Sequence, residues 1–249
     1  MSRIQFMVRF GYFGHFFHGL QPQKGLPTAG GTLQDWITEC AGQAPKALCF
    51  SARTDKGVHA LHNIGTFWFP NLEDIPGFLA RLQQCPCNGL VNVEAIEVDP
   101  SVHARGSALG KHYRYVLNGP DAQTSWQIVP ELNLTTMRLA LDACLGTHDF
   151  KSFQGGGCSA GTTVKTLFHL GLTSNEQGIQ IDIFGNAFLR KMIRNLVGVL
   201  VEIGTGLRKP GEMAEIIASK HRQAAGITAP ACGLTLVSVE LKNLGAFGT

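Results

Sequence analysis

Short stretches of alternating apolar and polar residues recur along the chain, which is the pattern of half-buried β-strands. In residues 3–10, Ile4, Phe6 and Val8 alternate with Arg3, Gln5, Met7 and Arg9. Comparable patterns predict further strands at residues 47–50, 63–69, 90–98, 112–117, 164–173, 178–184 and 234–241.

Helices are predicted where apolar residues recur at three- and four-residue spacing. Thr32 is expected to cap a helix over residues 33–42, and Thr135 a helix over residues 135–145. The remaining predicted helices are residues 73–84, 186–204 and 211–220.

The predicted elements of the first half follow the order strand, helix, strand, strand, helix, strand, which is typical of a ferredoxin-like unit. The second half has a similar order of predicted strands and helices, but its residues are not similar to those of the first half. We therefore expect an α+β protein of two ferredoxin-like (RRM-like) halves that share a largely antiparallel mixed sheet, with a catalytic cleft between them. The expected halves are residues 1–104 and 105–249, joined near residues 99–111.

Composition narrows the class of protein. A chain of 249 residues that is 44% hydrophobic and 16% charged fits a globular protein with a sizeable core. The formal net charge of +3 neither proves nor excludes a nucleic-acid partner. Seven scattered cysteines favour a reducing compartment. With no signal-peptide pattern and no apolar run long enough to cross a membrane, we expect a cytoplasmic protein.

The segment Arg53-Thr54-Asp55-Lys56-Gly57 places a carboxylate between two cations, in a loop between two predicted strands. In an extended chain Arg53 and Asp55 would point the same way. A neighbouring guanidinium favours the ionised carboxylate, which suits a nucleophile or a base. The alternative is a surface turn with a salt bridge worth about 0–1 kcal/mol.

Two segments free of acidic residues carry basic side chains. The first contains Arg105, Lys111 and Arg114, interleaved with Tyr113 and Tyr115. Cations can meet phosphates and rings can stack on bases, so this pattern fits RNA. The alternative is a half-buried strand with two core tyrosines.

The second basic segment lies in the predicted helix over residues 186–204, where Arg190 and Arg194 are four apart and share a face, with Lys191 beside them. Three cations without acids resemble a phosphate-facing surface. The alternative is the solvated face of an amphipathic helix.

Several kinds of site are not indicated. The sequence has no phosphate-binding P-loop, no dinucleotide fingerprint and no hydrolase nucleophile elbow, so no organic cofactor is expected. His59 and His62, or Cys85 and Cys87, do not complete a set of metal ligands, so no metal is expected either. His148-Asp149 is interpreted as a turn at the end of a helix.

Six segments, taken in order, resemble the tRNA pseudouridine synthase A family, and the match runs through nearly the whole chain. They are Gly11–Gly19 with Gln21 and Gln23, Ala52–Ala60, Tyr113–Tyr115, His148–Phe150 with Ser152 and Phe153, Gly185–Leu189 with Met192, Arg194 and Asn195, and Ala229–Leu234.

This resemblance implies an isomerase that converts uridine to pseudouridine in the anticodon stem-loop of tRNA, at tRNA positions 38–40. It implies that Asp55 is the catalytic residue, that Arg53 pairs with it and helps hold the flipped base, that Tyr113 stacks on the uracil and that Leu234 lines the pocket. Lys111, Arg114, Arg190, Lys191 and Arg194 would contact RNA. The implied assembly is a homodimer.

Two residues depart from the family pattern: Leu20 stands where tryptophan is common, and Lys56 where a small residue is usual. The alternatives are a tRNA- or RNA-binding protein without catalysis, and a glycosidase with paired acids. The second needs a carboxylate partner for Asp55, and the sequence shows no clear one.

Overall fold

The computed structural model describes residues 3–242 and divides the chain into two compact units. The first unit contains residues 3–111 together with 235–242, and the second contains residues 112–234. No helix within the described residues is both long enough and apolar enough to cross a membrane.

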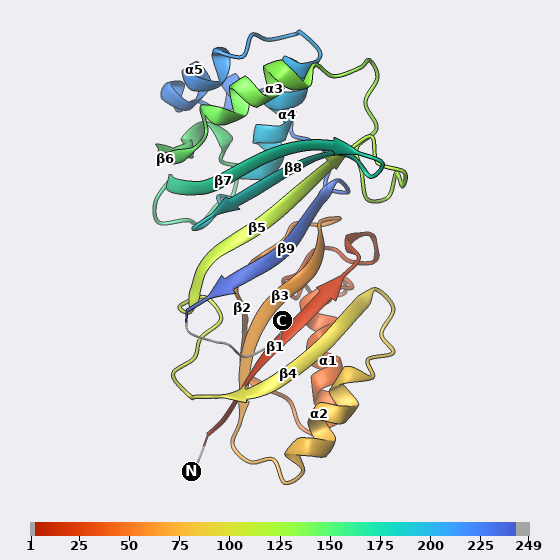
Figure 1. The fold of residues 1–249 in the computed structure, drawn as a ribbon. Helices are drawn as coiled ribbons and strands as arrows, with labels where there is room; N and C mark the ends of the chain where they lie inside the picture. Colours follow the sequence, from red (N-terminus) through yellow and green to blue (C-terminus); the bar gives the residue numbers. More distant parts are fainter. Residues whose placement is uncertain (1–2, 243–249) are drawn as a thin grey trace. The chain divides into compact units, whose positions relative to one another are not determined.

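The first unit is built around a sheet in which β1 (Ile4–Tyr12) is central. Its strand order is β4-β1-β3-β9, and β2 also pairs with β3. Figure 1 shows β4, β1 and β3 side by side. Its other elements are α1 (Ala29–Ala41), β2 (Lys46–Phe50), β3 (His59–Phe69), α2 (Ile75–Gln83), β4 (Leu90–Val98) and β9 (Leu234–Leu241), which begins one residue before the unit boundary.

A cluster of aromatic rings forms the core beneath this sheet. Phe6 on β1 lies opposite Phe67 on β3, and their ring centroids are 5.6 Å apart. Phe78 of α2 meets Phe6 edge-on at 5.3 Å, and both side chains are fully buried. The alternation expected of β1 thus directs Phe6 into the helix-covered core.

The first helix begins earlier than the sequence pattern predicts. Thr28, not Thr32, is its N-cap, because the Thr28 side chain accepts a hydrogen bond from the backbone N–H of Gly31 at 3.2 Å. Gly30 lies inside this helix. Glycine is required there because a Cβ would stand 2.5 Å from the carbonyl oxygen of Leu20. Gly30 and Gly31 have low intrinsic helix propensity, which favours a loop, but tertiary packing overrides that preference.

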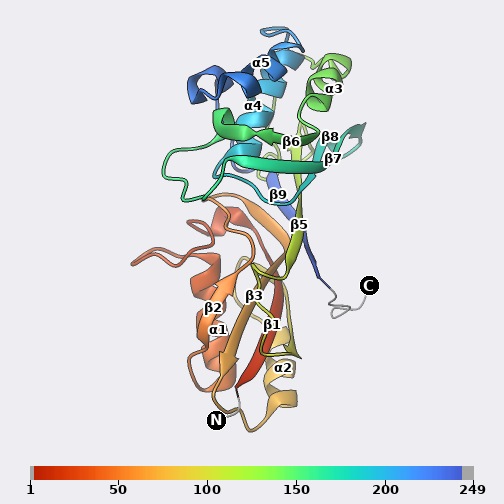
Figure 2. The same cartoon turned by 90° about the vertical axis from the view of Figure 1, so that its left-hand side faces the viewer.

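The second unit pairs its strands in the order β5-β8-β7-β6. Its helices α3, α4 and α5 gather on the same side of β7 and β8 (Figures 1 and 2). The elements are β5 (Ala108–Leu117, which begins in the first unit), α3 (Leu134–Asp142), β6 (Gly146–Asp149), β7 (Val164–Asn175), β8 (Gly178–Gly185), α4 (Met192–Gly204) and α5 (Glu212–Ser219).

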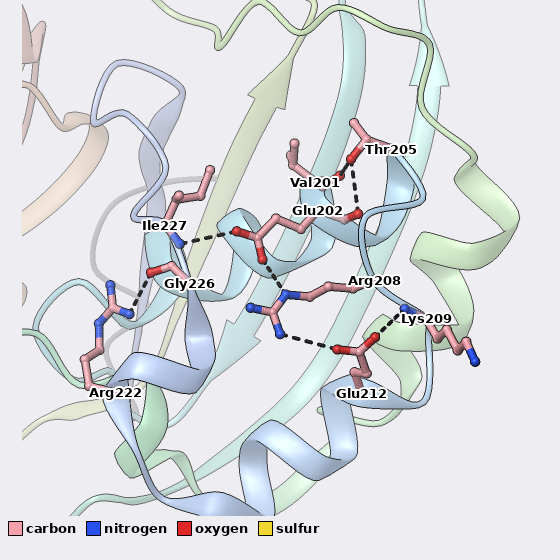
Figure 3. Close-up of polar contacts among 9 residues, drawn as sticks. All are labelled: Val201, Glu202, Thr205, Arg208, Lys209, Glu212, Arg222, Gly226 and Ile227. Carbon is pink, nitrogen blue, oxygen red and sulfur yellow. Dashed lines mark hydrogen bonds and ion pairs between the residues drawn. The ribbon is translucent and has the colours of Figure 1, made fainter.

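Polar contacts fasten α4 to the segments that follow it (Figure 3). Glu202 accepts a hydrogen bond from Arg208, and Arg208 also pairs with Glu212 at the start of α5. On its other oxygen Glu202 meets the backbone N–H of Ile227. A single half-buried carboxylate therefore joins two loops to one helix.

Three further local predictions are wrong. The helix expected over residues 186–204 starts at Met192, so residues 186–191 precede it. Asn133 caps α3 in place of Thr135, because its side chain accepts hydrogen bonds from the N–H groups of Thr135 and Thr136. His148-Asp149 belongs to strand β6, which pairs with β7, and is not a helix-end turn.

The α+β class is confirmed, and so is largely antiparallel pairing. β1–β3, β1–β4, β2–β3, β6–β7 and β7–β8 are antiparallel, whereas β3 and β9 run parallel. The ferredoxin-like character of each half and the cleft between them stay predictions.

Candidate active site

The loop that carries Asp55 joins β2 to β3 in the first unit. Asn63, fully buried on β3, braces its start: the side-chain amide donates to the Ala52 carbonyl at 2.9 Å. The Ser51 N–H donates to the Ile64 carbonyl at 2.8 Å. At the other end, the Val58 N–H donates to the Asp55 carbonyl at 3.2 Å and closes a turn. The backbone on both sides of the carboxylate is therefore fixed.

Thr54, the residue before Asp55, is held by two different groups. Its hydroxyl shares a 2.7 Å hydrogen bond with the hydroxyl of Tyr12, and its carbonyl accepts from the N–H of Leu20 at 3.2 Å. Tyr12 is 1% exposed, and burial raises its pKa to about 12 although its hydrogen bonds to Thr54 and Asn63 act in the opposite direction. The phenol consequently stays neutral near pH 7 and serves as an anchor.

Glycines let the opening loop of the chain lie directly against the Asp55 loop. A Cβ at Gly14 would stand 2.4 Å from the carbonyl oxygen of Val58. Gly19 has a φ of +93°, and a Cβ there would stand 3.0 Å from the carbonyl oxygen of Thr54. The two glycines of this sequence motif are thus required by a close approach of two backbones.

Asp55 is half-buried, and its sequence neighbours Arg53 and Lys56 are exposed. A partly shielded carboxylate on a rigid loop can add to an electrophilic carbon or accept a proton, provided that a substrate reaches it. The pairing of Arg53 with Asp55 stays a prediction.

Lys111 belongs to the first unit with Asp55 and is half-buried. Burial lowers the pKa of its ammonium, and the neighbouring Arg105 guanidinium lowers it further. Arg105 itself donates from Nε to the Phe50 carbonyl at 3.1 Å, so it braces the end of β2. The sequence pattern had grouped both residues as an RNA-facing run, and the structure gives Arg105 a structural contact.

Tyr113 and Tyr115 lie on the same, buried face of β5. Tyr113 is 6% exposed and meets the Phe188 ring edge-on at 5.2 Å. Tyr115 donates from its hydroxyl to the Pro230 carbonyl at 2.8 Å, and burial raises its pKa. A Cβ at Gly233 would stand 2.6 Å from the Tyr115 ring, so residues 230–233 lie against this strand.

Leu234 follows this loop and is 6% exposed. The next residue, Thr235, lies opposite His59 where β9 pairs with β3, and His59 is four residues after Asp55. Chain connectivity therefore restricts how far Leu234 can be from the start of β3.

Arg114 occupies the other side of β5, as strand alternation predicts, and pairs with a carboxylate of the same unit. Its Nε donates to Asp182 on β8 at 2.9 Å, and the His112 ring lies 2.7 Å from the same oxygen. Burial raises the pKa of Asp182, but the hydrogen bonds from His112 and Arg114 outweigh it and leave that pKa below its usual range. Arg114 thus has a structural partner in addition to its proposed RNA contact.

The predicted basic helix face does not form. Arg190 and Lys191 precede α4, and Lys191 takes the left-handed conformation with a φ of 59°. Arg190 donates to the Gly156 carbonyl at 2.8 Å, whereas Arg194 donates from Nε to the Ala229 carbonyl at 2.7 Å. Because helical spacing does not extend back to residue 190, the two arginines do not share a helix face.

Sequence reasoning missed the residues that fix the Asp55 loop, namely Tyr12, Thr54 and Asn63. Asn63 is one of several polar residues in β3, with His59, His62 and Thr66, so no local pattern distinguishes it. Within the described residues, no group of three or more histidine, cysteine or acidic side chains is arranged to hold a metal ion.

Comparison with known proteins agrees with the motifs. A family model described as tRNA pseudouridine synthase matches residues 140–241. Proteins named tRNA pseudouridine synthase A from Acetivibrio thermocellus and Thermoanaerobacter sp. strain X514 are 37% and 36% identical, and each alignment covers 96% of this chain and 99% of the relative. The protein of that name from Neisseria gonorrhoeae strain FA 1090 is 32% identical over 99% of this chain and 95% of the relative.

Identity of this extent over nearly the full length of both chains is not produced by one shared motif. The resemblance first seen in six short segments is confirmed: the chain belongs to the tRNA pseudouridine synthase A family, whose members are isomerases that act on uridine in tRNA.

Proposed function

We propose that this enzyme converts uridine to pseudouridine at positions 38–40 in the anticodon stem-loop of tRNA, with Asp55 as its catalytic residue. The observation that carries the assignment of Asp55 is the rigid loop around it, which Tyr12, Asn63 and Leu20 fasten through side-chain and backbone hydrogen bonds. Such bracing holds a reacting group in one place without further ordering during the reaction.

The reaction breaks the bond between C1′ and N1 and forms a bond between C1′ and C5. The C5 proton leaves to solvent, and N1 takes up a proton in its place. Reactant and product are isomers, so no redox or group-transfer partner enters the balance. Asp55 performs one of two steps: addition to the sugar, or abstraction of a proton. Both need an ionised carboxylate.

The uridine must leave its base stack to reach the carboxylate. Flipping costs a few kcal/mol, and contacts in the pocket offset that cost. In this proposal Tyr113 stacks on the uracil, which contributes about 1–3 kcal/mol, Leu234 lines the pocket and Arg53 pairs with Asp55.

The RNA backbone is proposed to meet Lys111, Arg114, Arg190, Lys191 and Arg194. Their positions on strand β5 and near the start of α4 support this role, although several of them also bind carbonyls or a carboxylate. The proposed assembly is a homodimer, and the proposed location is the cytoplasm.

Tritium release from tRNA labelled at C5 of uridine tests the catalytic assignment. Asp55→Asn keeps the size of the side chain and removes the carboxylate, so turnover should fall below detection while tRNA binding persists. Glu73→Gln removes an exposed carboxylate of the same unit and should leave turnover unchanged.

Retained turnover in Asp55→Asn would contradict the assignment of Asp55 as the catalytic residue. Absence of tritium release from the wild-type enzyme would instead favour an RNA-binding protein without catalysis. Mapping pseudouridine in tRNA from cells that lack the gene tests the target, because the loss is expected at positions 38–40 and a loss elsewhere contradicts that assignment.

A further inference from the structure

Three neighbouring rings near the start of the chain remain exposed to solvent. Phe13 and Phe16 are 43% and 48% exposed, and His15 between them is exposed as well. The His15 ring lies 5.9 Å from that of Phe13, nearly parallel to it, and 4.4 Å from that of Phe16. We call Phe13, His15 and Phe16 the aromatic row.

The aromatic row is attached to a rigid base. The Phe13 N–H donates to the Gly89 carbonyl at 2.9 Å, and the Gly14 N–H donates to Nδ1 of His59 at 3.2 Å. Gly89 has a φ of +88°, and a Cβ there would stand 2.8 Å from Cβ of Phe16. The backbone that carries the rings is therefore held in place, so stacking on them requires little reordering of this loop.

The base of the aromatic row also touches the catalytic loop. Gly14 packs so closely on Gly57 and Val58 that a Cβ there would overlap their backbone. Lys56, in the same turn as Asp55, is exposed. The two benzene rings, the His15 imidazole and the Lys56 ammonium are thus carried by two loops that pack against each other, and one of these loops holds Asp55.

This combination favours one kind of partner. Rings stack on unpaired bases whatever their identity, while nearby cations meet phosphates. A protein partner would gain more from an extended apolar patch than from three rings interleaved with basic groups. A substrate whose target base lies at Asp55 also brings neighbouring nucleotides to this position.

We propose that the aromatic row binds unpaired nucleobases of the tRNA that flank the target uridine, and that it helps to position the substrate. This inference rests on the proposed function, because it takes the tRNA at Asp55 as its starting point. The row contributes affinity and register, and Asp55 remains the group that reacts.

The test measures binding of an anticodon stem-loop RNA to variants made in the Asp55→Asn background, which prevents turnover. The double variant Phe13→Leu with Phe16→Leu keeps apolar bulk and removes both benzene rings. It should weaken binding by roughly 5- to 100-fold, the range expected for the loss of one stacking contact. Trp at both positions should preserve binding. Phe168→Leu, at an exposed aromatic residue of β7, should change nothing.

A base analogue such as 2-aminopurine next to the target position gives a second readout, because stacking quenches its fluorescence. Quenching should occur with wild-type and Trp variants and be lost with the Leu pair. Circular dichroism of each variant checks that the fold is retained. Unchanged affinity and unchanged quenching in the folded Leu pair would overturn the inference.

Two further outcomes separate this inference from its premise. If wild-type enzyme releases tritium but the Leu pair binds RNA normally, the proposed function stands and the role of the aromatic row is refuted. If binding depends on the aromatic row but the wild-type enzyme never releases tritium, the proposed catalytic function is refuted and the role of the row in RNA binding stands. A Leu pair that changes sedimentation and not RNA affinity would make the row a contact between copies of the chain, which also refutes the proposal.

Discussion

At the residue scale, the candidate site depends on polar groups that the reaction does not use. Tyr12 and Thr54 share a buried hydrogen bond, and Asn63 donates to Tyr12 at 3.4 Å and to Ala52 at 2.9 Å. The buried side chains of Tyr12, Thr54 and Asn63 each have a partner, as low-dielectric surroundings demand. The cost of disturbing one of them is therefore larger than the value of a single exposed hydrogen bond.

Tyr12→Phe should lower the free energy of unfolding by about 1–2 kcal/mol near pH 8, because it leaves the Thr54 hydroxyl without its partner. The wild-type protein should also lose stability as pH rises from about 10 towards 12. In that interval the unfolded tyrosine releases its proton, whereas burial holds the folded pKa near 12.

Urea unfolding at pH 8, 10 and 11 checks both expectations. Tyr115 also has a raised pKa and contributes the same trend, so the quantity of interest is the difference between wild type and Tyr12→Phe. That difference should shrink as pH rises. A constant difference would show that Tyr12 does not carry the expected proton linkage.

At the element scale, local periodicity predicted most strands and helices but misplaced several ends. The alternation placed Phe6 on a buried face of β1, but Gln5 and Met7 on the opposite face are buried as well. In β5, Tyr113 and Tyr115 share a buried face, as alternation allows. The start of α4 was not predictable in this way. Residues 186–191 carry a helix-like composition, yet Lys191 adopts a left-handed conformation and Arg190 binds Gly156 across the unit.

Asn195 in the first turns of α4 joins three other segments of the second unit. Its amide donates to the Phe153 carbonyl at 2.8 Å, and its oxygen accepts from Arg222 at 3.0 Å and from Thr228 at 2.6 Å. The side chain is fully buried. This one residue holds α4, the turn at Phe153 and the segment around Thr228 in register.

Asn195→Leu should therefore reduce the free energy of unfolding by about 2–4 kcal/mol, because the Phe153 carbonyl, Arg222 and Thr228 each lose a hydrogen bond that leucine does not replace. Denaturant unfolding measures the change. Asn71→Leu provides the matched control at an exposed position and should stay within about 0.5 kcal/mol of wild type. Similar values for the two variants would contradict this account of α4.

At the scale of the whole molecule, the distribution of charge matters more than the net value of +3. Several proposed RNA-binding cations already have partners within their own unit: Arg114 has Asp182, and Arg194 has the Ala229 carbonyl. Replacing those arginines would disturb folding as well as binding. Lys191 offers a cleaner test, since glutamine preserves much of its length and removes only the charge.

The logarithm of tRNA affinity should fall linearly with the logarithm of salt concentration, and Lys191→Gln should reduce that slope by about one. Lys46→Gln removes an exposed cation from β2 and serves as the control, with no expected change. Binding at four or more salt concentrations gives both slopes. If Lys191→Gln and Lys46→Gln behave alike, Lys191 does not meet a phosphate.

The sequence by itself determined the α+β class, which side chains share a face along the strands and, through six ordered motifs, the family. It also singled out Asp55, because family motifs and strand alternation are local properties of the chain. Only the tertiary structure decided that Tyr12 and Asn63 fasten the Asp55 loop, that α4 begins at Met192 and that Arg190 and Arg194 bind separate carbonyls. These features arise from contacts between residues far apart in sequence, whose energies no local pattern records.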